Sequence, residues 1–120
     1  MSLSGHRILV VEDEIIIAMQ LEGVLLDAGA EVIGPAMSAS EACDLIDTNR
    51  ITVAILDVRL SMGDSLAVAQ RLVADGIPFI FHTGNAERLR ASPWPQAPVV
   101  RKPAAPEVLT AAVAAAARKA

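Results

Sequence analysis

The sequence predicts an α/β domain in which a parallel sheet of five strands is covered by helices on both faces. Two observations lead to this fold class. Five short apolar segments alternate with amphipathic segments along the chain, which is the order of a doubly wound parallel sheet. The third apolar segment, Val53–Leu56, contains no polar residue, as expected of a strand buried on both faces. The 120 residues have the usual length of one domain, so we expect a single domain over residues 1–120 with no output domain.

The first half of the chain contains three predicted strands and two predicted helices. The strands are residues 8–11, 31–33 and 53–56, and the helices are residues 14–28 and 38–48. Gly29 is expected to stop the first helix, and Gly34-Pro35 to close the second strand. Ser38 with Glu41 three positions later has the spacing of a capping box, which predicts the start of the second helix.

The second half continues the alternation less regularly. We expect a helix at 65–74, a strand at 79–81, a short helix at 86–91, a strand at 99–101 and an alanine-rich helix at 106–119. Asp75-Gly76 is expected to end the first of these helices. Pro93, Pro95 and Pro98 forbid a long helix after the fourth strand, so the helix at 86–91 is expected to be short or mobile.

Composition and charge exclude several classes of protein. A hydrophobic content of 53% argues against disorder. The only aromatic residues are Phe79, Phe81 and Trp94, which leaves few platforms for stacking on nucleic acid. Residues 1–57 carry ten acidic and two basic side chains, which argues against a DNA-wrapping role and leaves a cation site open. No apolar stretch reaches the roughly 20 residues of a membrane span and no signal peptide is visible, so a cytoplasmic location with no membrane partner is predicted.

Polar residues follow four of the predicted strands within two positions. Glu12 and Asp13 follow the first strand, Asp57 the third, Thr83 the fourth and Lys102 the fifth. The carboxyl ends of parallel strands share one edge of the sheet, where ligands of such folds bind. The sequence therefore predicts that these five residues form one site.

The residue types at this edge suit a phosphoryl group. Carboxylates placed close together repel one another, and Mg²⁺ relieves this because it prefers oxygen ligands. Lys102 adds a positive charge, and the Thr83 hydroxyl can donate a hydrogen bond. Phosphoryl transfer is catalysed mainly by positioning and by neutralisation of charge, and an aspartate such as Asp57 can be the nucleophile.

The order and spacing of these residues resemble the receiver domain of response regulators in two-component signalling. The resemblance covers residues 7–118 and is carried by four motifs, Val-Val-Glu-Asp-Glu at 10–14, Ala-Ile-Leu-Asp-Val-Arg-Leu at 54–60, His-Thr-Gly at 82–84 and Arg-Lys-Pro at 101–103. It implies a flavodoxin-like fold with strand order 2-1-3-4-5. It also implies a sensor histidine kinase or phosphotransfer protein as phosphoryl donor, and a signalling role rather than an enzymatic one.

The resemblance also implies a role for each matching residue. Glu12 and Asp13 match the acidic pair that holds Mg²⁺, Asp57 the phosphorylated aspartate, and Arg59 the position whose backbone carbonyl also ligates the metal. Thr83 and Lys102 match the pair that binds the phosphoryl oxygens and relays the switch, and the Lys102-Pro103 bond is typically cis. Output would be protein–protein binding, through the face formed by residues 86–91, 99–101 and 106–119, or a phosphate-sink role.

Residues 78–84, Pro-Phe-Ile-Phe-His-Thr-Gly, are similar to a motif of stand-alone receivers called the FATGUY group. Two positions depart from it, because His82 replaces an alanine and Ala86 a tyrosine. The aromatic residue that switches many receivers is also absent, since Val99 stands three positions before Lys102. A rotating-aromatic switch therefore cannot operate in its usual form.

Three other functions remain as alternatives. A degenerate receiver would bind a partner without being phosphorylated, and the missing aromatics favour it. A phosphatase of the haloacid-dehalogenase type would need an acid two residues after Asp57, where Arg59 stands. A dinucleotide-binding fold would need a Gly-x-Gly-x-x-Gly motif after the first strand, which this sequence lacks.

Several single residues have a simpler structural interpretation. Glu14 is expected to favour a helix N-terminus, His82 to be a hydrogen-bonded structural residue, and Cys43 to be a small core residue. The Arg59 side chain either covers the site or faces solvent. Trp94 either anchors its loop to the body or contacts a partner.

Overall fold

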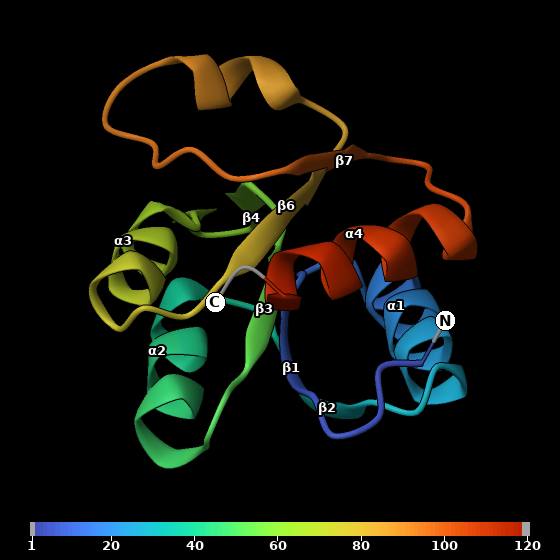
Figure 1. The fold of residues 1–120 in the computed structure, drawn as a ribbon. Helices are drawn as coiled ribbons and strands as arrows, with labels where there is room; N and C mark the ends of the chain where they lie inside the picture. The colour runs from blue at the N-terminus through green and yellow to red at the C-terminus, as the bar shows by residue number, and fades with distance from the viewer. Residues whose placement is uncertain (1, 119–120) are drawn as a thin grey trace.

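Residues 2–118 are described by a computed structural model, shown in Figure 1. All five predicted strands form one parallel sheet in the order β2-β1-β3-β6-β7, which confirms the predicted fold class and strand order. The strands are β1 (Arg7–Val11), β2 (Glu31–Ala36), β3 (Val53–Leu56), β6 (Phe79–Thr83) and β7 (Val99–Arg101).

Helices cover both faces of this sheet. One face is covered by α1 (Ile15–Asp27) and α4 (Pro106–Arg118), and the other by α2 (Ala39–Thr48) and α3 (Leu66–Ala74) (Figure 1). Lys119, the last residue of the predicted final helix, lies outside the described residues. Among residues 2–118, none of the helices combines the length and the apolar character needed to cross a bilayer.

The core has two layers, one on each side of the sheet, because successive residues of a strand point to opposite faces. On β6, Phe79 and Phe81 pack toward α2 and α3, whereas Ile80 packs toward α1 and α4. Trp94 is half-buried and packs edge-on against Phe81, with 5.8 Å between ring centroids. Of the two roles considered for Trp94, the structure therefore shows that it anchors the loop.

The prediction that Gly34-Pro35 closes the second strand was wrong. Strand β2 continues to Ala36, and its register with β1 shifts between Leu9 and Val11. Gly34 has a φ of +105°, and a Cβ atom there would lie 2.9 Å from the Val10 carbonyl oxygen, so only glycine fits this close approach. Pro35 is tolerated because β2 is an edge strand.

Other helix ends follow the sequence signals. Ser38 Oγ accepts a hydrogen bond from the Glu41 backbone N–H at 3.1 Å, and the Glu41 carboxylate accepts from the Met37 N–H. Asp75 ends α3, and Gly76 adopts a φ of +69°. The predicted short helix at 86–91 is a 3-10 helix, η1 (Ala86–Arg90).

A small antiparallel hairpin was not predicted. It consists of β4 (Arg59–Leu60) and β5 (Gly63–Asp64) and lies between β3 and α3. Leu60 packs into the core, while Met62 at the turn is 91% exposed. The hairpin places residues 59–64 beside the carboxyl end of β3, where the predicted site lies.

Candidate functional site

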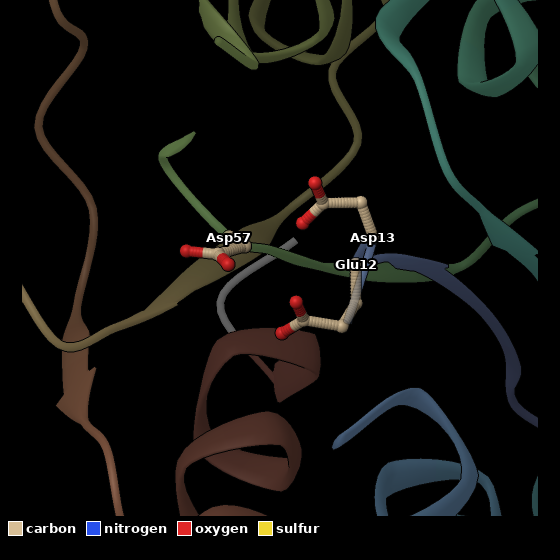
Figure 2. Close-up of side chains that lie close together, drawn as sticks. All are labelled: Glu12, Asp13 and Asp57. Carbon is tan, nitrogen blue, oxygen red and sulfur yellow. The ribbon is translucent and has the colours of Figure 1, made fainter. Parts of the chain in front are cut away.

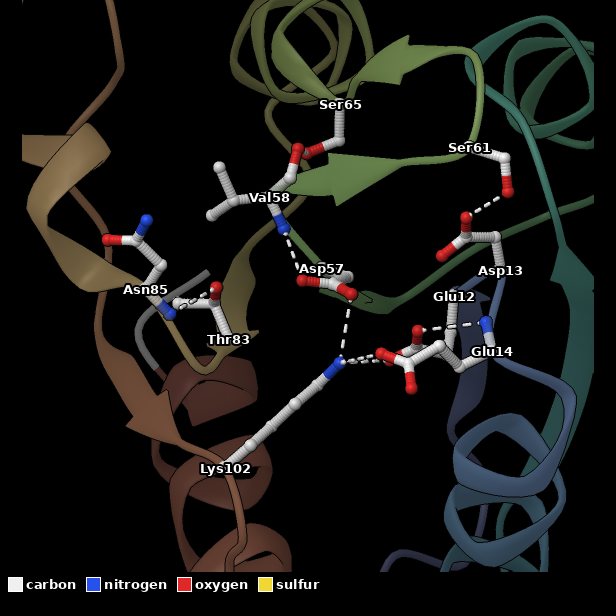
Figure 3. Close-up of polar contacts among 10 residues, drawn as sticks. All are labelled: Glu12, Asp13, Glu14, Asp57, Val58, Ser61, Ser65, Thr83, Asn85 and Lys102. Carbon is white, nitrogen blue, oxygen red and sulfur yellow. Dashed lines mark hydrogen bonds and ion pairs between the residues drawn. The ribbon is translucent and has the colours of Figure 1, made fainter.

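The predicted site residues converge at the carboxyl edge of the sheet (Figure 3). Glu12 follows β1, Asp57 follows β3, Thr83 ends β6 and Lys102 follows β7. A cavity of about 420 Å³ at this edge is lined by Asp13, Asp57, Arg59, Thr83 and Lys102, among others. Residues separated by up to 90 positions in the sequence are thus neighbours because their strands are parallel and adjacent.

Three carboxylates form the centre of the site. Oxygen atoms of Glu12, Asp13 and Asp57 all lie within 4.8 Å of one another, and their side chains converge in Figure 2. Glu12 is 1% exposed and Asp57 is 6% exposed, whereas Asp13 is half-buried. Water can therefore screen the repulsion between these groups only in part.

Lys102 supplies the opposing charge. Its ammonium nitrogen lies 2.9 Å from Oδ2 of Asp57, to which it donates a hydrogen bond. It also lies 2.7 Å from Oε1 of Glu12, but off the direction that a hydrogen bond requires. The lysine side chain is 14% exposed, so both ion pairs are largely shielded from water.

This environment shifts two pKa values. Burial raises the pKa of Glu12 to about 7, and the Asp57 charge adds to the shift, while Lys102 opposes both effects. Burial alone would lower the pKa of Lys102, but the nearby carboxylates of Glu12 and Asp57 outweigh this effect and raise that pKa. The lysine is therefore a permanent cation in the site, while Glu12 exchanges a proton near neutral pH.

Backbone groups orient the remaining polar atoms. Oδ1 of Asp57 accepts a hydrogen bond of 2.8 Å from the Val58 N–H, so both oxygens of this carboxylate have a donor. Oγ1 of Thr83 accepts from the Asn85 N–H at 3.1 Å. The hydroxyl proton of Thr83 is thus available to a group that enters the cavity.

The hairpin forms one wall of the cavity. Arg59 is exposed on β4 and lines the cavity with Leu60 and Ser61, and the Ser61 hydroxyl donates to Oδ2 of Asp13 (Figure 3). Arg59 is therefore exposed at the edge of the cavity, as expected of a side chain that faces solvent.

The donor set fits a hard divalent cation. Three carboxylates have oxygen atoms within 4.8 Å of one another, and one buried oxygen of Glu12 lacks a directed hydrogen bond. Carboxylate oxygens are the ligands that Mg²⁺ prefers. A cation there would also compensate the excess negative charge that Lys102 alone leaves.

The sequence analysis missed three contacts in the site and misjudged one residue. Ser61 and Asn85 hold Asp13 and Thr83, and no motif marks either of them. Glu14 precedes α1, as predicted, but its Oε1 also lies 3.8 Å from the Lys102 nitrogen. The expectation of a hydrogen-bonded His82 was wrong, because its Nδ1 is buried without a partner among the described residues.

One feature of the backbone also matches the implied family. The Lys102-Pro103 bond is cis, as the resemblance predicted. A family model described as "Response regulator receiver domain" matches residues 8–114. The chain belongs to this receiver family. Such receivers are signalling domains rather than metabolic enzymes.

Individual relatives agree with this assignment. Over 111 residues the receiver is 34% identical to the Phyllosphere-induced regulator PhyR of Methylorubrum extorquens. The aligned residues are 89% of this chain and 42% of that protein. The receiver is 30% identical over 84 residues to the Transcriptional regulatory protein PdtaR of Mycobacterium tuberculosis, covering 69% of the chain and 41% of that protein. The chain thus spans about two fifths of the length of these curated relatives.

Solved receivers have the same fold. SdrG from Sphingomonas melonis superposes with a TM-score of 0.80 at 37% identity, over 96% of this chain and 98% of that one. The response regulator PhyR from Brucella abortus superposes with a TM-score of 0.86 at 30% identity, over 98% of this chain and 49% of that one.

Proposed function

We propose that this receiver accepts a phosphoryl group on Asp57 from a phosphohistidine of a sensor histidine kinase or phosphotransfer protein. The single observation that carries the proposal is the position of the Asp57 carboxylate. It is held between the Lys102 ammonium at 2.9 Å and the Val58 N–H at 2.8 Å, with two further carboxylates within 4.8 Å. In the reaction the nitrogen–phosphorus bond of the donor breaks as a bond from an Asp57 oxygen to phosphorus forms.

Glu12, Asp13 and Asp57 are the residues that would hold Mg²⁺, with the backbone of Arg59 as a further ligand. When bound, the cation would neutralise charge on the phosphoryl oxygens. Lys102 contributes a second positive charge from the end of β7, and its raised pKa keeps it protonated. The Thr83 hydroxyl can donate to one phosphoryl oxygen, and Asn85 holds that hydroxyl in place.

Phosphorylation would be read out at a second surface. Thr83 is followed directly by the segment that carries η1, and a groove of about 980 Å³ lies between η1, β7 and the start of α4. Val99 on its floor is 41% exposed, and Arg90 and Arg101 line it. The groove therefore favours a protein partner that presents apolar and acidic side chains.

One solved relative supports a protein partner. The solved PhyR of Bartonella quintana, 28% identical to this chain over 99% of its length, is described as an anti-anti-sigma factor. We propose that the receiver likewise signals by protein–protein contact or acts as a phosphate sink.

Phosphotransfer from a purified, phosphorylated histidine kinase tests the phosphoacceptor role. Wild type should gain one phosphoryl group from the kinase phosphohistidine in the presence of Mg²⁺, whereas Asp57→Asn should gain none. Asp64→Asn is a matched control, because Asp64 lies on β5 outside the carboxylate cluster. Labelling that persists in Asp57→Asn would remove Asp57 from this role.

A receiver that binds its partner without phosphorylation is the second candidate. The observation that favours it is the absence of an aromatic residue at Val99, on the floor of the groove. NMR titration with Mg²⁺ and beryllofluoride separates the two functions. Resonance shifts around Asp57 that spread to residues 84–98 support the phosphoacceptor, and no shifts around Asp57 support the second candidate.

A further inference from the structure

The turn of the β4–β5 hairpin contacts one of the three clustered carboxylates. Ser61 lies between the two strands of the hairpin, and its hydroxyl donates a hydrogen bond to Oδ2 of Asp13, 48 positions away in the sequence (Figure 3). Ser61 also lines the cavity of the candidate site. The contact therefore joins the loop that follows β3 to the loop that follows β1, at the place where a cation would bind.

Asp13 differs from the other two carboxylates in how it is held. Glu12 and Asp57 each accept a hydrogen bond from a backbone N–H and each face the ammonium group of Lys102. Within the described part of the chain, the Ser61 hydroxyl is the one hydrogen-bond donor to the Asp13 carboxylate, and no basic side chain pairs with it. The orientation of Asp13 thus depends on a single neutral side chain.

Charge repulsion opposes the observed orientation of Asp13. One oxygen atom of Asp13 lies within 4.8 Å of oxygen atoms of Glu12 and Asp57, and like charges at such distances repel. Asp13 is half-buried, so rotation of its side chain toward water would relieve the repulsion. Ser61 opposes that rotation by holding Oδ2, and Figure 3 shows the other oxygen of Asp13 directed toward Asp57. One oxygen is thereby left for a cation.

The hairpin keeps Ser61 itself in place. Its neighbour Leu60 is 8% exposed and belongs to the core. Leu60 pairs with Gly63 across the hairpin, and the Ser65 N–H closes its base by donating to the Val58 carbonyl oxygen at 3.0 Å. The backbone on both sides of Ser61 is therefore fixed, although its side chain reaches the surface.

We propose that Ser61 is a positioning residue for Mg²⁺, and that its hydroxyl acts by orienting Asp13 as a ligand. The inference rests on the proposed function, because it requires the cation site formed by Glu12, Asp13 and Asp57. Loss of an outer hydrogen bond to a metal ligand typically lowers metal affinity by about 10- to 100-fold. Ser61 is exposed, and water can replace part of its hydrogen bond, so an effect at the lower end of this range is expected.

Calorimetric titration of the full chain with Mg²⁺ tests the role of the hydroxyl. Ser61→Ala should raise the dissociation constant by about tenfold, whereas Ser61→Thr keeps the hydroxyl and should bind Mg²⁺ like the wild type. Ser40→Ala, at an exposed position of α2, is the matched control and should leave the affinity unchanged. Wild-type affinity in Ser61→Ala, or an equal loss in Ser61→Thr, would overturn the proposal.

A double-mutant cycle tests whether Ser61 acts through Asp13. Asp13→Ala removes the acceptor of the hydrogen bond, so adding Ser61→Ala to it should change the dissociation constant for Mg²⁺ by much less than Ser61→Ala does in the wild type. Residues in direct contact show such non-additive effects, while independent residues do not. An equal fold-change in both backgrounds would show that Ser61 acts independently of Asp13.

Phosphotransfer separates this inference from the proposed function. Ser61→Ala should need more Mg²⁺ than the wild type but reach the same maximal rate of phosphorylation, and a lower maximal rate would contradict a role limited to Asp13. If the wild type binds Mg²⁺ and accepts the phosphoryl group while Ser61→Ala has wild-type Mg²⁺ affinity, only the role of Ser61 is overturned. If the wild type binds no Mg²⁺, the proposed cation site is wrong and the role of Ser61 is overturned with it.

Discussion

The ammonium nitrogen of Lys102 donates a hydrogen bond of 2.9 Å to Oδ2 of Asp57, across 45 positions of sequence. The contact joins the end of β7 to the end of β3, two strands that are not neighbours in the sheet because β6 lies between them. A long side chain is needed to bridge that separation. The same nitrogen also faces Glu12 at 2.7 Å, so one base balances two buried acids.

Replacement of Lys102 by Met should destabilise the metal-free protein. The substitution keeps most of the apolar stem but leaves Glu12 and Asp57 buried without their cation. We expect the free energy of unfolding to fall by about 2–3 kcal/mol, less than for a fully buried pair because the cavity opens to water. Urea denaturation with a chelator present measures this. Arg88→Met, on exposed η1, is the control and should change stability by under about 0.5 kcal/mol.

Binding of Mg²⁺ should weaken as the pH falls below 7. The pKa of Glu12 is raised to about 7, so at lower pH the cation must displace a proton from this carboxyl, and the apparent affinity falls by up to about tenfold per pH unit. Above pH 7 the affinity should be level. Calorimetric titrations at pH 6, 7 and 8 check the trend, and Glu12→Gln should remove it.

The same pKa has a consequence for stability without Mg²⁺. A carboxyl whose pKa is higher in the folded than in the unfolded chain binds protons more tightly when folded, so its contribution to the free energy of unfolding decreases as pH rises from about 4.5 to about 7. The free energy of unfolding of Glu12→Gln minus that of the wild type should therefore increase over this pH range. A constant difference would show that Glu12 titrates normally.

Replacement of Asp13 by Asn should raise stability and impair cation binding. Asp13 is half-buried beside two carboxylates, and it accepts a hydrogen bond from the neutral Ser61 hydroxyl. Removal of this charge should increase the free energy of unfolding by about 0.5–1 kcal/mol in chelator and weaken Mg²⁺ binding by about tenfold or more. Asp44→Asn, at an exposed position of α2, is the control and should alter neither quantity. A loss of stability in Asp13→Asn would contradict the argument from charge repulsion.

Two glycines should respond to alanine in opposite directions. At Gly34, with a φ of +105°, the new Cβ would lie 2.8 Å from the Ala36 nitrogen and 2.9 Å from the Val10 oxygen, so Gly34→Ala should cost about 2 kcal/mol or more. At Gly23, within α1, nothing lies within 4 Å of the new Cβ, so Gly23→Ala should stabilise by about 0.5–1 kcal/mol. Thermal unfolding of both variants measures the contrast.

The positions of Glu12, Asp57, Thr83 and Lys102 could be predicted because each follows a strand that the hydrophobic pattern reveals. Once the sheet is parallel, its geometry brings these residues together without further information. The end of the second strand was misplaced at Gly34 because the dipeptide Gly34-Pro35 has the composition of a turn. The strand continues through these two residues because Gly34 packs closely against Val10 and because Pro35 lies on an edge strand. Both are tertiary effects.

The contacts that the sequence did not reveal are formed between elements with no shared motif. Ser61 meets Asp13 through a hairpin whose strands have two residues each, too short to show a hydrophobic period. Nδ1 of His82 is buried without a hydrogen-bond partner among the described residues, and the elements packed around it decide this. Such features depend on how whole elements pack, so local pattern carries no signal for them.

The packing of Trp94 on Phe81 gives this protein a built-in optical reporter. The chain has one tryptophan and no tyrosine, so its near-ultraviolet emission comes from a single indole. That indole packs against the ring of Phe81, two residues before Thr83. Thr83 is directly followed by the segment expected to respond to phosphorylation. Rearrangement of residues 84–98 would change the polarity around the indole, and fluorescence would follow it in real time without any added dye.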